Sequence, residues 1–129
     1  MSGLLPNEGE NFLIDLLVNR SLEIGLFTNA TVDENITHAA LVEPTGGGYA
    51  RKAMGYANWT VAGDTATGLL QTFSVTLTSY NAAVRGYFIC TAATPKKIIA
   101  IEVDANLGGS GVVFTVGSSY DITPTLTAA

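Results

Sequence analysis

Charged residues are scarce in this chain. They make up 13% of its 129 residues, whereas 47% are hydrophobic, and an ordinary soluble domain carries roughly 25% charged residues. A composition this apolar supports a packed core and argues against an intrinsically disordered chain. Because few charges are left to solvate a free surface, the composition favours a protein that packs against neighbouring molecules.

Basic residues are scarcer than acidic ones. Six Lys and Arg stand against eleven Asp and Glu, which gives a net charge of −5. The adjacent cations are Arg51–Lys52 and Lys96–Lys97, too few to form a basic stripe. Because phosphate neutralisation supplies most of the non-specific affinity for nucleic acids, we expect no nucleic-acid partner.

Cysteine occurs once, as Cys90, so an internal disulfide is excluded. Cys90 lies in an apolar run, and we interpret it as a small buried side chain and not as a nucleophile. The sequence has no apolar run of 18 residues, the length of a membrane span, and its first residues lack the pattern of a signal peptide. We therefore expect synthesis in the cytoplasm and no membrane partner.

Residues that could carry catalysis are also few. The only histidine is His38, which we interpret as a solvent-exposed loop residue. The carboxylate pairs Asp33–Glu34 and Glu102–Asp104 are typical of solvated surfaces, and the loop around Asp33 lacks the spacing of an EF-hand. We expect no catalytic, cofactor-binding or metal-binding residues and no enzyme activity. A hydrolase that uses His38 or these acids stays open as an alternative.

One α-helix is predicted near the N-terminus, over residues 8–18. Asn7 and Glu10 have the spacing of a capping box, and apolar residues recur along one face. Four of these are candidate interaction residues: Phe12, Leu13, Leu16 and Leu17. Because so short a helix is marginal alone, it must dock, either on the β-domain or, as we favour, on a neighbouring subunit. We divide the chain into a helical arm, residues 1–20, and a β-domain, residues 21–129.

The rest of the chain has the pattern of short strands separated by turn residues. Alternation predicts strands over residues 21–29, 70–78 and 96–104, and the apolar run 82–92 predicts a central strand. Runs at 111–117 and 120–127 follow, and Pro124 restricts the last to an edge strand or a tail. The pattern favours a mainly β fold, a jelly-roll-like antiparallel β-sandwich with one short N-terminal helix.

Alternation also predicts which side chains face inward. These are Leu22, Ile24 and Leu26 in the first strand, Phe73, Val75 and Leu77 in the strand at 70–78, and Ile99, Ile101 and Val103 in the strand at 96–104. Residues 30–48 are rich in turn formers and are predicted to be irregular.

The glycine run at residues 46–48 does not match a phosphate-binding loop, which needs Gly-Lys-Ser/Thr followed by a helix. We interpret residues 45–59 as a turn that leads into a core strand, with Tyr49 and Trp59 as packing residues. An exposed Tyr and Trp that stack on a sugar form the alternative.

The order of four short blocks resembles a class of small tailed-bacteriophage virion proteins. The blocks are residues 25–29 (Gly-Leu-Phe-Thr-Asn), 48–51 (Gly-Tyr-Ala-Arg), Trp59 and 86–89 (Gly-Tyr-Phe-Ile). The resemblance covers roughly residues 22–116. Members of this class are structural components of the particle, either capsid decoration (cement) proteins or tail-associated and fibre-associated proteins.

The resemblance implies a virion location and, as partners, the major capsid protein or other virion proteins. We expect a decoration protein that stabilises the coat lattice without catalysis, and a homo-oligomer, with a trimer favoured. The alternative within this class is a tail or fibre module that binds other virion proteins or a host-surface glycan.

Overall fold

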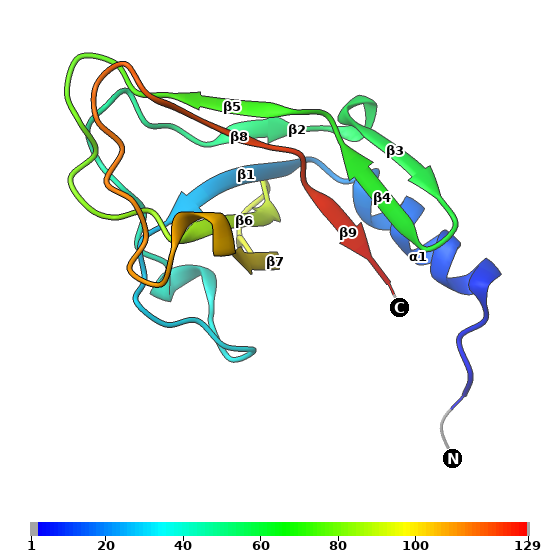
Figure 1. The fold of residues 1–129 in the computed structure, drawn as a ribbon. Helices are drawn as coiled ribbons and strands as arrows, with labels where there is room; N and C mark the ends of the chain where they lie inside the picture. The colour runs from blue at the N-terminus through cyan, green and yellow to red at the C-terminus, as the bar shows by residue number, and fades with distance from the viewer. Residues whose placement is uncertain (1–2, 129) are drawn as a thin grey trace.

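The computed structural model describes residues 3–128, which are mainly β, with antiparallel sheets and one α-helix (Figure 1). The helix, α1, spans Asn7–Val18. The largest sheet has four strands in the order β2-β1-β6-β7. Their bounds are Lys52–Met54 for β2, Leu22–Phe27 for β1, Gly86–Thr91 for β6 and Ile98–Val103 for β7.

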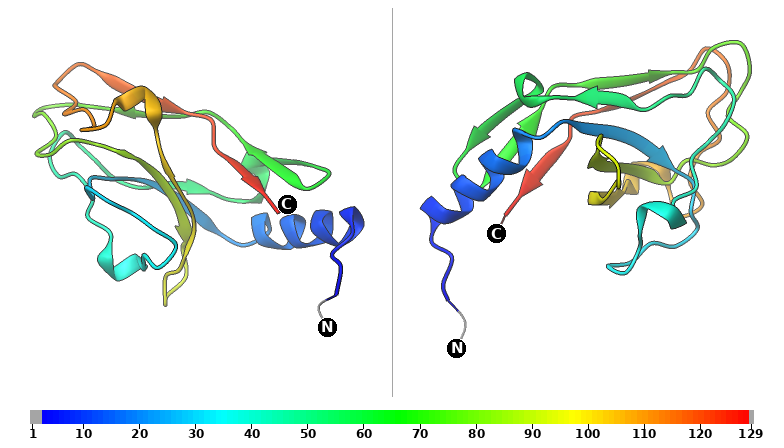
Figure 2. Two further views of the ribbon diagram at one scale, coloured as in Figure 1. Left: turned by 60° about the horizontal axis from the view of Figure 1, so that its bottom comes forward. Right: turned by 180° about the vertical axis from the view of Figure 1, so that it is seen from behind.

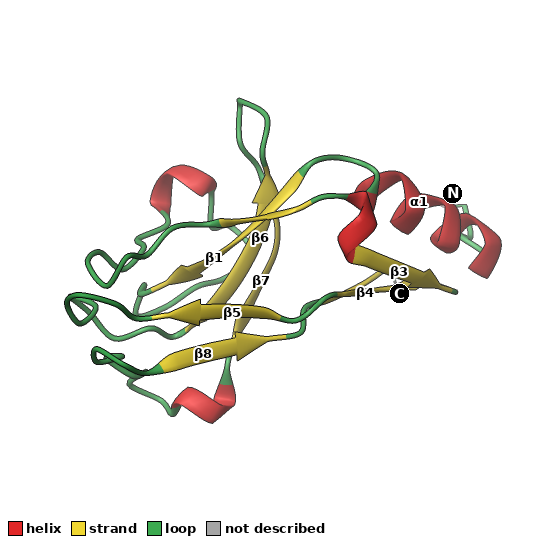
Figure 3. Cartoon of the chain, turned by 90° about the horizontal axis from the view of Figure 1, so that it is seen from above, coloured by secondary structure: helices red, strands yellow, loops and turns green. Residues whose placement is uncertain are grey.

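The other strands form a second layer, whose β5–β8 part lies over one face of the four-stranded sheet and whose β3-β4-β9 part continues to one side, beside helix α1 (Figures 1, 2 and 3). One part is a three-stranded sheet in the order β3-β4-β9, with bounds Trp59–Ala62, Thr65–Gly68 and Thr125–Thr127. The other is the ribbon of β5, Gln71–Ser74, and β8, Ser119–Ile122. Three single helical turns lie in the connections, at His38–Ala40, Tyr56–Asn58 and Ala105–Leu107.

The main core lies between the two layers. In β1, Leu22, Ile24 and Leu26 are buried, as the alternation predicted, and they belong to one cluster with Phe73 and Tyr120 of the β5–β8 ribbon. Pairing across β1 and β6 places Ile24 opposite Ile89 and Leu26 opposite Tyr87.

The opposite face of the four-stranded sheet is also covered. Phe27, Phe88 and Cys90 are fully buried there, and Val32 and Leu41 of the irregular segment 28–48 pack against them. This segment lies across the outer face of the sheet (Figure 1). It explains why β6, second from the edge of the sheet, is apolar on both faces.

The glycine run forms a turn, as predicted. Gly46, Gly47 and Gly48 all have positive φ, and a Cβ on Gly47 would lie 2.6 Å from the Tyr80 ring. The chain then enters β2, and Trp59 at the start of β3 is only 7% exposed, with its Nε1 donating to the Met54 carbonyl at 3.2 Å. The interpretation of Trp59 as a core residue is confirmed.

Helix α1 begins differently from the prediction. Its N-cap is Pro6, without a side-chain cap, and Asn7 is already helical, so the predicted capping box is wrong. The helix packs along β3 and β4 (Figure 3) through Ile14 and Val18, both buried in the main core. Asn11 Nδ2 adds a hydrogen bond to the Gly63 carbonyl at 2.6 Å, in the β3–β4 turn.

Four strand predictions need correction. Strand β5 ends at Ser74; Phe73 and Val75 are buried, but Leu77 is 91% exposed with φ of 68°. Residues 111–117 form no named strand, only an isolated bridge from Val112 to Val84. The predicted run 120–127 divides at Pro124 into β8 and β9, which belong to different sheets, and β9 is an edge strand, as Pro124 indicated.

The fourth correction concerns β7. A bulge makes Ile89 and Cys90 face Ala100 and Ile98, so that Ile99 is the extra residue. As a result, Ile99 packs on the main core and Ile101 on the outer-face cluster, while Val103 is 53% exposed. The prediction that these three residues share one inward face is wrong because strict alternation ends at a bulge.

Candidate functional site

The predicted interaction residues lie on helix α1 and divide into two groups. Phe12, Leu13 and Leu16 are exposed, at 62%, 47% and 50%. Leu17 is partly buried and packs against the main core. Three of the four predicted residues are therefore available to a partner.

The helix is apolar on two opposite faces. At 100° per residue, Ile14 and Val18 point one way, into the core, and Phe12 and Leu16 point the other way. Leu5 extends the free face, because its Cδ1 lies 2.9 Å from the position of a Cβ on Gly9. A surface helix of an isolated domain needs one apolar face, so the second face requires an explanation.

An apolar groove of about 260 Å³ runs along one side of the free face. Leu13 and Leu17 line it from the helix, Ile99 and Ala100 from β7, and Leu126 from β9. The strands β7 and β9 are each at the edge of their sheet, and the C-terminal strand lies beside the helix (Figures 1 and 2).

A second candidate site is a charged cluster on the outer face of the four-stranded sheet, centred on Arg51. The Arg51 Nε and Nη2 donate to the two carboxylate oxygens of Glu43, each at 2.9 Å. Its Nη1 lies 3.4 Å from Oε1 of Glu23, which also accepts from Lys96 Nζ at 2.8 Å. The guanidinium stands 5.1 Å above the Phe88 ring.

Electrostatics in this cluster favours charged carboxylates. Burial raises the pKa of Glu43, but hydrogen bonds from Arg51 and Tyr49 outweigh it and hold the pKa below the ordinary value of 4.5. The pKa of Glu23 is lowered likewise, because Lys96 and Arg51 outweigh burial. Both acids are therefore ion-pair partners and not proton donors at neutral pH.

His38 and Cys90 both contact Arg51. His38 Nε2 lies 2.9 Å from Arg51 Nη2, so that a neutral imidazole accepts this hydrogen bond. His38 is partly buried, and the expectation of a solvent-exposed histidine is wrong. Cys90 is fully buried, as predicted, and burial raises the pKa of its thiol.

The cluster connects distant segments. Glu23 comes from β1, Cys90 from β6, Lys96 from the β6–β7 turn, and Glu43 and His38 from the segment that covers the sheet. Within the part of the chain that the structure describes, each acid of the cluster forms an ion pair: Glu43 with Arg51, and Glu23 with both Arg51 and Lys96. The arrangement fixes the covering segment to the sheet. Sequence reasoning missed this cluster because its members lie in five separate segments.

The predicted carboxylate pairs lie elsewhere. Tyr87 donates to Glu102 at 2.6 Å and Tyr120 donates to Asp104, beside a polar pocket of about 250 Å³. Asp33 is exposed and accepts from the Asn35 backbone at 2.9 Å. Over residues 3–128, no group of three or more His, Cys, Asp or Glu is arranged to hold a metal ion.

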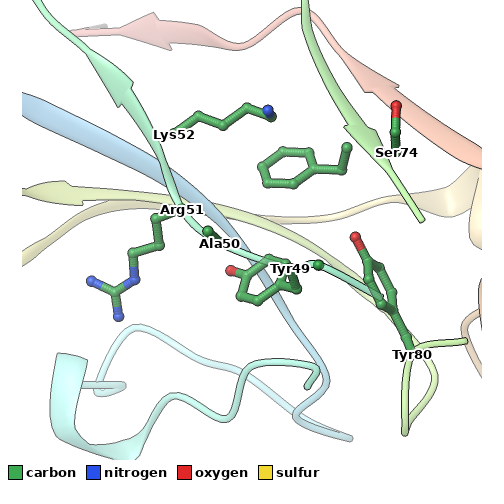
Figure 4. Close-up of a pocket in the computed structure, with 8 residues that line it drawn as sticks. Tyr49, Ala50, Arg51, Lys52, Ser74 and Tyr80 are labelled. Carbon is green, nitrogen blue, oxygen red and sulfur yellow. The ribbon is translucent and has the colours of Figure 1, made fainter. Parts of the chain in front are cut away.

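A small pocket of about 110 Å³ lies between β2 and β5 (Figure 4). Tyr49, Phe73 and Tyr80 form its apolar side, and Lys52 Nζ stands 5.3 Å from the Phe73 ring. Trp59 is not part of this pocket and is buried, so it cannot form the exposed sugar-stacking platform considered as the alternative.

Comparisons of the chain with models of protein families, with curated proteins and with solved structures found no match. Among the described residues, no helix is both long and apolar enough to cross a membrane.

Proposed function

We propose that this protein is a non-enzymatic structural protein of a tailed-phage virion, folded as a jelly-roll-like β-sandwich. We place it on the capsid, as a decoration protein that reinforces the coat lattice, in contact with the major capsid protein. Its work is mechanical: a folded unit that binds the assembled lattice stabilises that lattice by mass action.

The observation that carries this proposal is the position of the residues on which the resemblance rests. Arg51 stands over the ring of Phe88, and the Tyr49 hydroxyl accepts from the Leu26 backbone at 2.9 Å. Gly25 admits both rings, since a Cβ there would lie 2.6 Å from Phe88 and 2.7 Å from Tyr49.

Three blocks that are far apart in sequence therefore meet on one sheet, where they hold the fold together. A rigid sheet suits a protein that bears load, and an exposed apolar helix face suits one that assembles with others. Both features support a structural role in a particle.

The decisive experiment counts copies per particle. Quantitative mass spectrometry of purified virions should give hundreds of copies for a decoration protein, and particles stripped of the protein should release their genome at a lower temperature. Adding back the purified protein should restore the original temperature. A handful of copies per particle would indicate a tail protein. Absence of the protein from the particle would contradict the proposal.

The non-enzymatic part has its own test. His38→Ala should leave incorporation into particles and infectivity unchanged, although it removes one contact of Arg51. Cys90→Ser should likewise assemble. Normal incorporation together with lost infectivity in His38→Ala would favour the hydrolase alternative.

A further inference from the structure

We propose that the free face of α1 and the adjoining groove bind a second copy of this chain across a two-fold axis, with the two α1 helices antiparallel. This inference concerns the isolated protein in solution and does not depend on the virion assignment. It replaces the expected trimer with a two-fold pair.

The face carries a large part of the apolar surface that a stable interface needs. It exposes Phe12, Leu13 and Leu16, and Leu5, which is 45% exposed, adjoins them at Gly9. A standard interface buries roughly 800 Å² per partner, of which about 60% is non-polar. The groove beside the face adds the apolar surfaces of Leu17, Ile99 and Leu126.

The surface is complementary to itself. It combines a ridge, formed by Phe12 and Leu16, with the groove between α1, β7 and β9. A two-fold axis applies the same patch twice, so the ridge of each copy faces the groove of the other. An unrelated partner would need to supply both shapes.

Charge determines the direction of the helices. Glu8 lies in the first turn of α1, one helical turn before Phe12 of the free face, and Arg20 follows two residues after the end of the helix. In an antiparallel pair Glu8 of one helix lies beside Arg20 of the other, and the two helix dipoles also oppose favourably. A parallel pair would place Glu8 beside its own copy.

Sedimentation equilibrium of the full chain over a series of concentrations tests the pairing. Wild type should show a mass of two chains. Phe12→Lys and Leu16→Lys should each raise the dissociation constant by about 30-fold or more, as for a central interface residue. Leu70→Lys is the matched control, because Leu70 is 58% exposed outside this face, and it should pair as wild type does.

Charge reversal tests the orientation at two exposed positions where folding is not at risk. Glu8→Arg and Arg20→Glu should each weaken pairing, and the double variant should restore it. Three results would overturn the proposal: a monomeric wild type at every concentration, a mass of three chains, or pairing that survives Phe12→Lys and Leu16→Lys. A double variant that stays weakened would overturn the antiparallel orientation. If the lysine variants fail to fold by circular dichroism, the charge variants decide alone.

Discussion

At the scale of single residues, Arg51 has the largest number of roles. Its guanidinium forms a two-point contact with Glu43, reaches Glu23 and His38, and lies over the Phe88 ring. Only a planar, permanently charged group can make these contacts together. The side chain is 18% exposed, so water weakens the ion pairs without removing them.

We therefore expect Arg51→Ala to lower the free energy of unfolding by about 2–3 kcal/mol. This is below the roughly 3–5 kcal/mol that follows from breaking a fully buried pair. Arg51→Lys keeps the charge but not the paired geometry, and it should recover only part of the loss. Urea unfolding followed by circular dichroism measures both. Equal stability of wild type and Arg51→Ala would show that the cluster contributes nothing to the fold.

Trp59 gives the second prediction at this scale. Because its ring is buried and its Nε1 bonds to the Met54 carbonyl, Trp59→Ala should cost about 3–5 kcal/mol. Trp59→Phe refills most of the cavity and should cost less. In wild type, tryptophan fluorescence should be blue-shifted and poorly quenched by acrylamide. Emission typical of a solvated indole would contradict the packing of β3 on the core.

At the scale of elements, helix α1 serves two surfaces at once. Ile14 belongs to the main core, whereas Leu16, two residues later, is half exposed. Alanine substitution at Ile14 and at Leu16 separates core packing from the exposed face. Both positions are helical, and each substitution removes a side chain of similar size. Ile14→Ala should lower the free energy of unfolding by about 2–4 kcal/mol. Leu16→Ala should change it by roughly 0.5 kcal/mol or less.

Thermal unfolding at a concentration where the protein is monomeric measures both variants. Equal losses would mean that the helix is docked on a different face.

The burial of Ile14 and Val18 also predicts that deleting residues 1–20 opens the core. The truncated chain should therefore be destabilised, and not merely impaired in self-association as the division into arm and β-domain predicts.

The elements show what the sequence can and cannot predict. Strand β1 follows simple alternation and was predicted with its buried face, as was the doubly buried β6. Leu77, Ile101 and Val103 were assigned to the inward face wrongly, because a left-handed residue and a bulge each break the period of two. The helix was predicted from its spacing, but the prediction named only the face of Phe12, Leu13, Leu16 and Leu17, and it missed the core face of Ile14 and Val18.

At the scale of the whole molecule, a segment without regular strands has the covering role that a sheet layer has on the other side. Residues 28–48 cover the outer face of the four-stranded sheet, and Asn29 closes the loop 29–42 by donating to the Ala40 carbonyl and accepting from the Val42 backbone. No sequence pattern predicts that an irregular segment of this kind covers an apolar face of a sheet. Its attachment depends on Val32 and Leu41 and on the ion pairs of Arg51.

Acid should loosen this attachment. The pKa values of Glu43 and Glu23 are lowered in the folded protein from an ordinary value of 4.5. The unfolded chain therefore binds protons first as the pH falls, and the stability contributed by these acids is complete above that value and lost below it. The free energy of unfolding of wild type should thus decrease as the pH falls from 4.5 through the lower, folded-state values.

Glu43→Gln isolates this effect. The variant should be less stable than wild type at neutral pH, because Arg51 loses its two-point charged partner, and its stability should decline less steeply below pH 4.5. Glu34→Gln, in the same segment but exposed, is the matched control and should keep the wild-type slope. Urea unfolding at a series of pH values, followed by Trp59 fluorescence, gives the slopes. If Glu43→Gln keeps the full wild-type dependence, then Glu43 does not govern the response to acid, and its ion pair with Arg51 does not hold the covering segment.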